Sequence, residues 1–405
     1  MKRVTKTANS PAKAQKIAKK DDENQQQQLP EIPDEIRCIQ TNKDIQKLKT
    51  LNLKNGAKYQ IQRLLGEGVF GIVFECHDEN KEKIAAKVMK KTNEPPDTWK
   101  IELHILEKVA KYPHDNIIHF LGVESLQSPP THCTEHVIVT NALGPSVLDV
   151  MSTAAKSLNA DDQGCTFPTP DIRSIGRQIV AAMAHLDTVV GVYHLDLKPE
   201  NIYFVADGTF DIHRLPSRHA SIRMRDTRVQ LGDFGCSKFH KRAETDVKPT
   251  MVQTQNYRAP EVFLGLPYSV KSDVWSFGAM MCEMYTGELL FFGTNVDDDG
   301  DGEQLRHSEA TQFEMMQRVV GQYCSRAMMR KALSEGSEKL RQQAGILQRG
   351  AAKKFEPTQP LHMHIKRFDF PAIALFKMLA DVLILDPDYR PTFQELQKHT
   401  FFVDD

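Results

Sequence analysis

Apolar and polar residues alternate with two different periods along this chain. Between residues 59 and 90 the apolar residues come in short β-rich runs, which is the pattern of strands bounded by turns. The runs predict a strand over 59–65 that ends at Gly66, a return strand at 72–74 and a third strand over 84–89. From Trp99 to Val109 the apolar residues recur at helical spacing, which predicts that a helix follows the strands.

Helical spacing dominates the second part of the chain. After residue 171, one face of a predicted helix is formed by Ile172, Ile175, Ile179, Met183 and Leu186. Further helices are predicted over 274–285, 313–320 and 376–385. A β-rich part followed by a helix-rich part predicts an α+β fold of two lobes around a cleft. We place the small β-rich lobe at about 59–140 and the larger, mainly helical lobe at about 145–402.

The first 55 residues show neither period. Lysine and arginine occur without any acid up to residue 20, and a glutamine run follows at 25–28. This stretch has too little apolar surface to offset the entropy of ordering, so we expect a disordered, basic and Gln-rich tail over 1–55. Such a cluster is most often a solvated tail, and a nuclear address or a nucleic-acid-steering arm is the alternative.

Two further stretches resemble insertions, at about 206–230 and at 295–303. The second is rich in acids and can be compared with a calcium-binding loop. Counting from Asp297, however, position 12 is Ser308, where such a loop needs a bidentate glutamate. We therefore expect a solvated acidic loop at 297–303.

The overall composition excludes several classes of protein. The chain has 52 basic and 53 acidic residues, and its formal net charge of -1 argues against direct binding of nucleic acid or of an anionic membrane. It has no apolar run long enough to cross a membrane and no secretory signal. Its seven scattered cysteines form no CxxC pair, which is typical of reduced intracellular thiols. We expect an intracellular monomer, nuclear or cytoplasmic, with the basic tail favouring the nucleus.

Three sequence blocks that carry chemistry occur in a fixed order. They are His194-Leu195-Asp196-Leu197-Lys198-Pro199-Glu200-Asn201, Asp233-Phe234-Gly235 and Ala259-Pro260-Glu261. A single triplet arises by chance, but three ordered blocks preceded by a glycine loop and a lysine do not. This order is typical of the catalytic loop, the metal-binding turn and the activation-segment end of a protein kinase. It indicates a transferase that moves a phosphoryl group from ATP.

The glycine loop and the lysine precede these blocks. The loop fits the pattern G-x-G-x-x-G-x-V through Gly66, Gly68, Gly71 and Val73. Glycines there let backbone amides approach the ATP phosphates. The same pattern occurs in Rossmann turns, but a strand follows it here, not a helix. Lys87 would hold the α- and β-phosphates and pair with Glu102, since the rival Glu107 falls on a different helix face.

The catalytic loop supplies the groups that act on the substrate. Asp196 is the expected base for the substrate hydroxyl, and Asn201 with Asp233 would bind the Mg²⁺ that bridges the phosphates. Lys198 would neutralise charge on the transferred phosphoryl group, and a lysine there is the Ser/Thr-kinase form of the loop. His194 is expected to be a packing residue, because proton transfer is already assigned to Asp196.

From about residue 59 to 402 the chain resembles the eukaryotic protein kinases, and within them the LAMMER, or Cdc-like, dual-specificity kinases of the CMGC group. The resemblance rests on Asn256 to Val262 with its Arg258, on Leu143-Gly144-Pro145-Ser146 after the hinge, and on Asp226 to Val229 before the metal-binding turn. It also rests on 314–321, an eroded form of the motif that names the family. The positions that match this motif are Met315, Met316, Arg318 and Gly321.

This resemblance implies further roles. Thr140 would be the gatekeeper, and Asn141 to Leu143 would be the hinge that contacts adenine. The family tends to have an acid at Asn141, a change that we expect to be tolerated because backbone groups read adenine. Thr254 would line the substrate hydroxyl beside Asp196.

Three other positions are implied to be structural. Asp273 would anchor the catalytic-loop backbone, and Glu261 would pair with Arg390. Leu195 replaces an arginine that clasps a phosphorylated activation loop in many kinases, so we expect activity that does not depend on that clasp.

We therefore expect a Ser/Thr kinase that uses ATP and Mg²⁺, with tyrosine as a further acceptor during autophosphorylation. Its protein substrates are expected to be basic, with Arg/Ser-rich proteins as the leading class, because the loop at 297–303 is acidic. The alternative is a pseudokinase scaffold, which the eroded motif, the unusual loop residues and the insertions would favour. Against it, the residues that usually change in pseudokinases are all present: Lys87, Glu102, Asp196, Asn201 and Asp233. A third reading is another member of the same kinase group outside LAMMER.

Overall fold

The computed structural model describes residues 48–68, 70–91, 98–130, 132–158, 165–214, 220–240, 252–292, 304–335, 360–365 and 370–403. Most of the predicted tail and the acidic loop at 297–303 lie outside these ranges. Within them, no helix is both long enough and apolar enough to cross a membrane.

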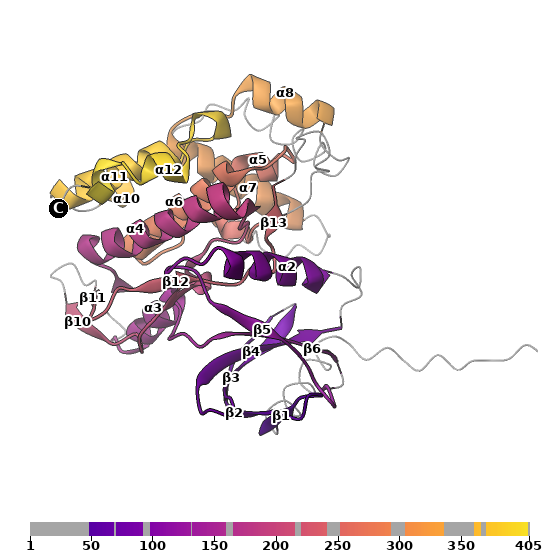
Figure 1. Cartoon of the computed structure of the whole chain (residues 1–405). Helices are drawn as coiled ribbons and strands as arrows, with labels where there is room; N and C mark the ends of the chain where they lie inside the picture. Colours follow the sequence, from indigo (N-terminus) through magenta and orange to yellow (C-terminus); the bar gives the residue numbers. More distant parts are fainter. Residues whose placement is uncertain are drawn as a thin grey trace, which may run out of the picture.

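The first lobe is a curled antiparallel sheet of six strands in the order β1-β2-β3-β4-β6-β5 (Figure 1). The strands are β1 (Thr50–Asn52), β2 (Lys58–Glu67), β3 (Gly71–His77), β4 (Lys83–Lys90), β5 (Phe120–Ser125) and β6 (Cys133–Asn141). Apolar residues on one face, such as Phe74, Val88 and Val137, form a buried core of their own. On the other face Ile105 and Leu106 of helix α2 (Thr98–Lys111) join the main core of the protein.

Strand β1 corrects the predicted boundary of the tail. Residues 50–52 lie within the 1–55 stretch that we expected to be disordered, yet they pair with 58–60. Leu51 and Leu53 are 3% and 0% exposed in the sheet core, and Gly56 turns the chain with a φ of 94°. Two buried leucines are enough to dock a short strand, and a three-residue strand is too short to show a period in the sequence.

The second lobe is built around a buried helix, α6 (Val270–Thr286), in which every residue from Ser272 to Tyr285 is buried. A helix that is buried all round forms the centre of a domain. The helices around it are α3 (Val147–Lys156), α4 (Thr169–His185), α5 (Pro260–Phe263), α7 (Gln304–Val320), α8 (Arg326–Glu335), α10 (Leu361–His364), α11 (Phe370–Val382), α12 (Phe393–Leu396) and α13 (Thr400–Val403).

The predicted helices are present, with shifted ends. The predicted apolar face after residue 171 is the buried face of α4 and of the short π-helix Leu186–Val190 that continues it. Helix α7 starts nine residues before the predicted 313, in a polar stretch whose period is weak. The helix predicted over 376–385 is α11, which begins at Phe370 and ends at Val382.

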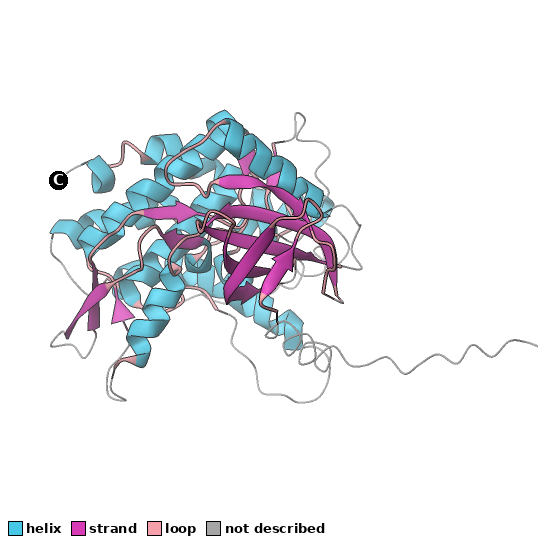
Figure 2. Ribbon diagram, turned by 60° about the horizontal axis from the view of Figure 1, so that its bottom comes forward, coloured by secondary structure: helices cyan, strands magenta, loops and turns pink. Residues whose placement is uncertain are grey.

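The insertion at about 206–230 forms a hairpin, β10 (Phe210–Arg214) and β11 (Ala220–Met224), that adds β7 (Cys165–Thr166) as a parallel third strand. Figure 2 shows these short strands apart from the large sheet of the first lobe. The backbone N–H of Met224 donates to Asp171 on the first turn of α4 (2.8 Å). The chain then enters β12 (Val229–Leu231), which pairs with β9 (Ile202–Phe204) and brings Asp233 beside the catalytic loop.

Candidate active site

The catalytic loop 194–201 runs between β8 (Val192–Tyr193) and β9, and helix α6 holds its backbone. The buried carboxylate of Asp273 accepts the N–H of His194 (2.9 Å) and the N–H of Leu195 (2.7 Å). Leu195 has a φ of 63°, a left-handed conformation that a leucine adopts only where its surroundings impose it. Burial raises the pKa of Asp273 to about 7, while the two N–H groups oppose that shift. Asp273 thus has the anchoring position that the resemblance implied.

Asp196 lies at the centre of a small polar group. Its Oδ1 accepts the hydroxyl of Thr254 (2.6 Å), and its Oδ2 lies 2.9 Å from the Lys198 ammonium and 3.2 Å from the Asn201 amide. Lys198 also donates to the Thr254 hydroxyl (2.9 Å). Burial alone would lower the pKa of Lys198, but the hydrogen bond and charge of Asp196, together with Glu200, raise it. The structure therefore places Thr254, Lys198 and Asn201, which were expected to line the substrate hydroxyl, to face the phosphoryl group and to bind Mg²⁺, around the carboxylate of Asp196.

Lys87 joins the two lobes of the site. Its ammonium lies 2.6 Å from Glu102 Oε1 on α2 and 3.4 Å from Asp233 Oδ1. The rival Glu107 is exposed on the other side of α2, so the expected pairing with Glu102 is the one present. Burial would lower the pKa of Lys87, but the two carboxylates raise it. The charge of Lys87 in turn lowers the pKa of Asp233 and keeps that carboxylate ionised.

The metal-binding turn packs against His194. The ring of Phe234, 1% exposed, meets the His194 ring edge-on with centroids 5.3 Å apart. The Nδ1 of His194 accepts the N–H of Asp196 (3.2 Å), so its Nε2 carries the proton and donates to the carbonyl of Gly232 (3.1 Å). Burial lowers the pKa of His194, which keeps the ring neutral. These contacts agree with the packing role expected of His194.

Asn201 and Asp233 fit a magnesium ion held together with phosphates. The amide nitrogen of Asn201 donates to the Asp196 carbonyl (2.8 Å), which leaves its side-chain oxygen available to a metal ion. The carbonyl of Asn201 accepts the N–H of Gly232 (2.9 Å), so the two ligand segments are tied together. No group of three or more His, Cys, Asp or Glu among the described residues could hold a metal by itself. Two hard oxygen ligands suit Mg²⁺, which completes its shell with phosphates and water.

The glycine loop closes the top of the site. A Cβ on Gly71 would lie 2.8 Å from the carbonyl oxygen of Val88, so a side chain cannot fit there. The space beside Gly66 and Gly68 is open. Val73 on β3 pairs with Lys87 on β4, which places the end of the loop directly beside this lysine.

Of the hinge residues, Thr140 and Asn141 end strand β6, and Leu143 lies in the connection from β6 to α3. The Asn141 side chain accepts the N–H of His119 (2.7 Å) and donates to Gln230 on β12 (2.9 Å). The oxygen of this amide thus ties the hinge to the residue before β5, and its nitrogen ties the hinge to β12, the strand before Asp233. This role could not be predicted, because an asparagine followed by a small residue resembles any loop.

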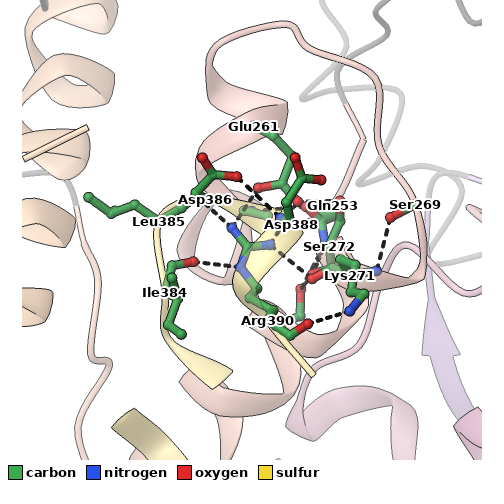
Figure 3. A network of polar contacts seen from close by, with 12 residues as sticks. Gln253, Glu261, Ser269, Lys271, Ser272, Ile384, Leu385, Asp386, Asp388 and Arg390 are labelled. Carbon is green, nitrogen blue, oxygen red and sulfur yellow. Dashed lines mark hydrogen bonds and ion pairs between the residues drawn. The ribbon is translucent and has the colours of Figure 1, made fainter. Parts of the chain in front are cut away.

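Arg258 and Arg390 brace the segment beyond the substrate site. Arg258 donates to the carbonyls of Val252 and Gln253, each at 3.0 Å. Arg390 donates to both carboxylate oxygens of Glu261 at 2.8 and 2.7 Å, as Figure 3 shows. The pairing of Glu261 with Arg390 that the resemblance implied is thus present.

Glu200 is a residue of this site that the sequence reasoning missed. It lies on the catalytic loop between Asp196 and Asn201, and its Oε2 is buried without a hydrogen-bond partner in the described part of the chain. Its charge contributes to raising the pKa of Glu283 to about 7, after the larger effect of burial. The signal available in the sequence was the position of Glu200 within the catalytic loop.

The fold and this site define a protein kinase domain. The sequence model of the protein kinase domain family matches residues 59–402, and the chain therefore belongs to the protein kinase family, whose members use ATP and Mg²⁺. A solved crystal structure of a kinase domain superposes with a TM-score of 0.65 at 28% identity, covering 88% of this chain and 97% of that one.

The curated relatives place the chain beside the LAMMER kinases of the CMGC group, as the resemblance indicated. The dual specificity protein kinase lkh1 of Schizosaccharomyces pombe is 29% identical over 87% of this chain. The serine/threonine-protein kinase AFC3 of Arabidopsis thaliana is 30% identical over 85% of this chain and 82% of its own length. The human dual specificity protein kinase CLK2 is 28% identical over 85% of this chain and 64% of its own length. The aligned region spans only 48% of lkh1, about half of that protein.

Proposed function

We propose that this kinase transfers the γ-phosphate of ATP to serine and threonine hydroxyls of basic proteins, with Asp196 as the base. The observation that carries the proposal is the polar group around Asp196. A carboxylate 2.6 Å from the hydroxyl of Thr254 and 2.9 Å from the ammonium of Lys198 is placed to orient a second, incoming hydroxyl and to accept its proton.

The other roles follow from position and charge. Lys87, held by Glu102, would bind the phosphates, and Lys198 would stabilise the negative charge of the transferred group. Asn201 and Asp233 would hold Mg²⁺, which when bound neutralises charge on the ATP phosphates. The ATP-binding surface would further comprise Gly66, Gly68, Gly71, Val73, Thr140, Asn141 and Leu143.

The preference for basic substrates is supported by Glu200. A buried carboxylate oxygen without a partner is costly, and a substrate arginine or lysine beside the phosphorylated residue would supply the missing donor. The lysine Lys198 marks a Ser/Thr acceptor, and tyrosine would be limited to autophosphorylation. We propose Arg/Ser-rich proteins as the substrate class, and a monomer in the nucleus or cytoplasm that binds neither nucleic acid nor membrane directly.

Radiolabelled phosphate transfer from Mg-ATP tests this function. The substrates are three serine peptides of equal length, flanked by arginine, by glutamate or by neutral residues, with Asp196→Asn as the inactive control. We expect transfer that vanishes in D196N and prefers the arginine peptide, and a Glu200→Gln variant that loses this preference. Equal rates on all three peptides would remove the basic-substrate proposal. ATP binding without any transfer would favour the scaffold alternative.

A further inference from the structure

Helix α7 contacts residues 252–258, here called the substrate segment, through a buried glutamine. Gln312 is 0% exposed, and its side-chain amide donates to the carbonyl of Gln255 at 2.8 Å. Its neighbour Phe313, also 0% exposed, packs edge-on against Phe263 of α5 with ring centroids 6.5 Å apart. Its side-chain oxygen Oε1 is buried without a hydrogen-bond partner in the described part of the chain, so the bond from its amide nitrogen to Gln255 is the polar contact that holds this side chain in position.

Gln255 directly follows the residue that contacts the proposed base. The hydroxyl of Thr254 donates to Asp196, and the backbone carbonyl of Thr254 accepts the N–H of Tyr257 (2.9 Å). The Gln255 carbonyl accepts a second, longer bond of 3.2 Å from the N–H of Arg258. The bond from Gln312 to this carbonyl is the shorter of the two, at 2.8 Å against 3.2 Å, and it comes from a different element of the fold.

The rest of the segment is held in the same way. Arg258 binds the carbonyls of Val252 and Gln253, and the Gln253 side chain donates to Ser276 on α6 (2.8 Å). Gln253 has a φ of 68°, which is left-handed backbone that a glutamine adopts only when its surroundings impose it. Side chains thus bind the carbonyls of 252, 253 and 255, and the one that binds 255 comes from α7.

We propose that Gln312 is a positioning residue for the protein substrate: by fixing the Gln255 carbonyl it holds Thr254 and the surface beside Asp196 where the substrate chain must lie. This inference rests on the proposed kinase function and deepens it. Gln312 belongs to α7, which carries the eroded family motif at 314–321, whereas Lys87 and the glycine loop lie in the first lobe. Loss of Gln312 should therefore weaken substrate binding without weakening ATP binding.

The same helix offers a matched control. Gln317 is also buried, at 6% exposed, and its side chain also makes a bond to backbone, accepting the N–H of Cys324 (2.9 Å). That bond holds the turn after α7, and not the substrate segment. Gln312→Met and Gln317→Met each remove one buried amide and one hydrogen bond at similar volume. Q312M also removes a buried oxygen that has no partner, so it should cost no more stability than Q317M.

The test compares steady-state kinetics of the wild type, Q312M, Q317M and Q312H, a variant that keeps an N–H donor. The substrate is the arginine-flanked serine peptide. Loss of one buried hydrogen bond should raise the KM for this peptide about fivefold to tenfold in Q312M, while the KM for ATP stays within about twofold of wild type. Q317M and Q312H should keep the wild-type KM for the peptide. Equal effects of Q312M and Q317M, or a parallel rise in the KM for ATP, would reduce Gln312 to a packing residue.

Hydrogen–deuterium exchange of the backbone over 252–258 gives a second readout that needs no activity. Exchange there should become faster in Q312M than in Q317M, and unchanged protection would overturn the proposal even if the peptide KM had risen. An inactive wild type with faster exchange in Q312M would instead refute the proposed function and leave the positioning contact supported.

Discussion

Arg390 offers the sharpest test of how the second lobe is held together. Its guanidinium is 0% exposed and pairs with Glu261, whose side chain is 1% exposed. The remaining donors bind the carbonyls of Ile384 (2.6 Å), Lys271 (2.9 Å) and Leu385 (2.9 Å). One side chain therefore ties α5, the start of α6 and the loop after α11 into a single unit (Figure 3).

Arg390→Met keeps most of the apolar stem but leaves the Glu261 carboxylate buried without its cation. Breaking a buried ion pair from one side costs about 3–5 kcal/mol, chiefly through the uncompensated charge. A domain the size of residues 59–402 loses about 0.7 kcal/mol of stability per degree near its midpoint, from about 2.1 cal/mol/K per residue. The expected fall in Tm is therefore about 4–7 °C.

Differential scanning calorimetry of three proteins measures this effect: the wild type, R390M and the double variant E261Q/R390M. The double variant removes the buried charge, so it should recover at least about half of the loss. In the wild type the hydroxyl of Ser272 donates to one oxygen of Glu261 (2.6 Å), and the glutamine of the double variant can accept the same bond. A fall of less than about 1 °C in R390M, or a double variant no more stable than R390M, would show that the charge is compensated elsewhere and that this account is wrong.

Three further perturbations address the site and the stability of the second lobe. Glu102→Gln removes the charge that holds Lys87 and should lower kcat/KM by at least about tenfold in a peptide phosphorylation assay, without unfolding the protein in circular dichroism. Glu283 has a folded-state pKa raised to about 7 by burial, so its contribution to stability is full below about pH 4.5 and is lost as the pH rises through 7. Glu283→Gln should therefore gain about 2 kcal/mol relative to wild type between pH 5 and pH 8 in urea unfolding, and a constant difference would contradict the shift. Because Leu195 is buried where other kinases have an arginine, phosphatase treatment should leave activity within about twofold, and loss of activity restored by a phosphothreonine in 237–254 would refute this.

The residues of the site were accessible from sequence because phosphoryl transfer restricts both residue type and order. The reaction requires side-chain oxygens at fixed positions, which are expected from Asp196, Asn201 and Asp233 on two adjacent loops. The spacing of these three residues is visible in the sequence. The choice of Glu102 over Glu107 needed only the helical period of α2. The distances among these residues were beyond the sequence, because they depend on how the two lobes meet.

Contacts made by ordinary residue types could not be predicted in this way. Gln230, Gln253 and Gln312 each bind a carbonyl or an amide far away in sequence, and a glutamine in the sequence signals no partner. Strand β1 was missed for a related reason. Its pairing depends on the space between β2 and the end of β5, where Leu53 forms a bridge with Leu126, and not on its own three residues.

Contacts of this kind support the expectation that activity does not depend on an arginine at the position of Leu195. An arginine at that position would bind a phosphate and so order the activation segment. Here the leucine is buried, and its N–H is bound by Asp273. The segment 252–255 is fixed from its other side by Arg258, through the carbonyls of Val252 and Gln253, and by Gln312 of α7. A segment whose carbonyls are already bound has little left for a phosphate to order, so its geometry is built into the fold.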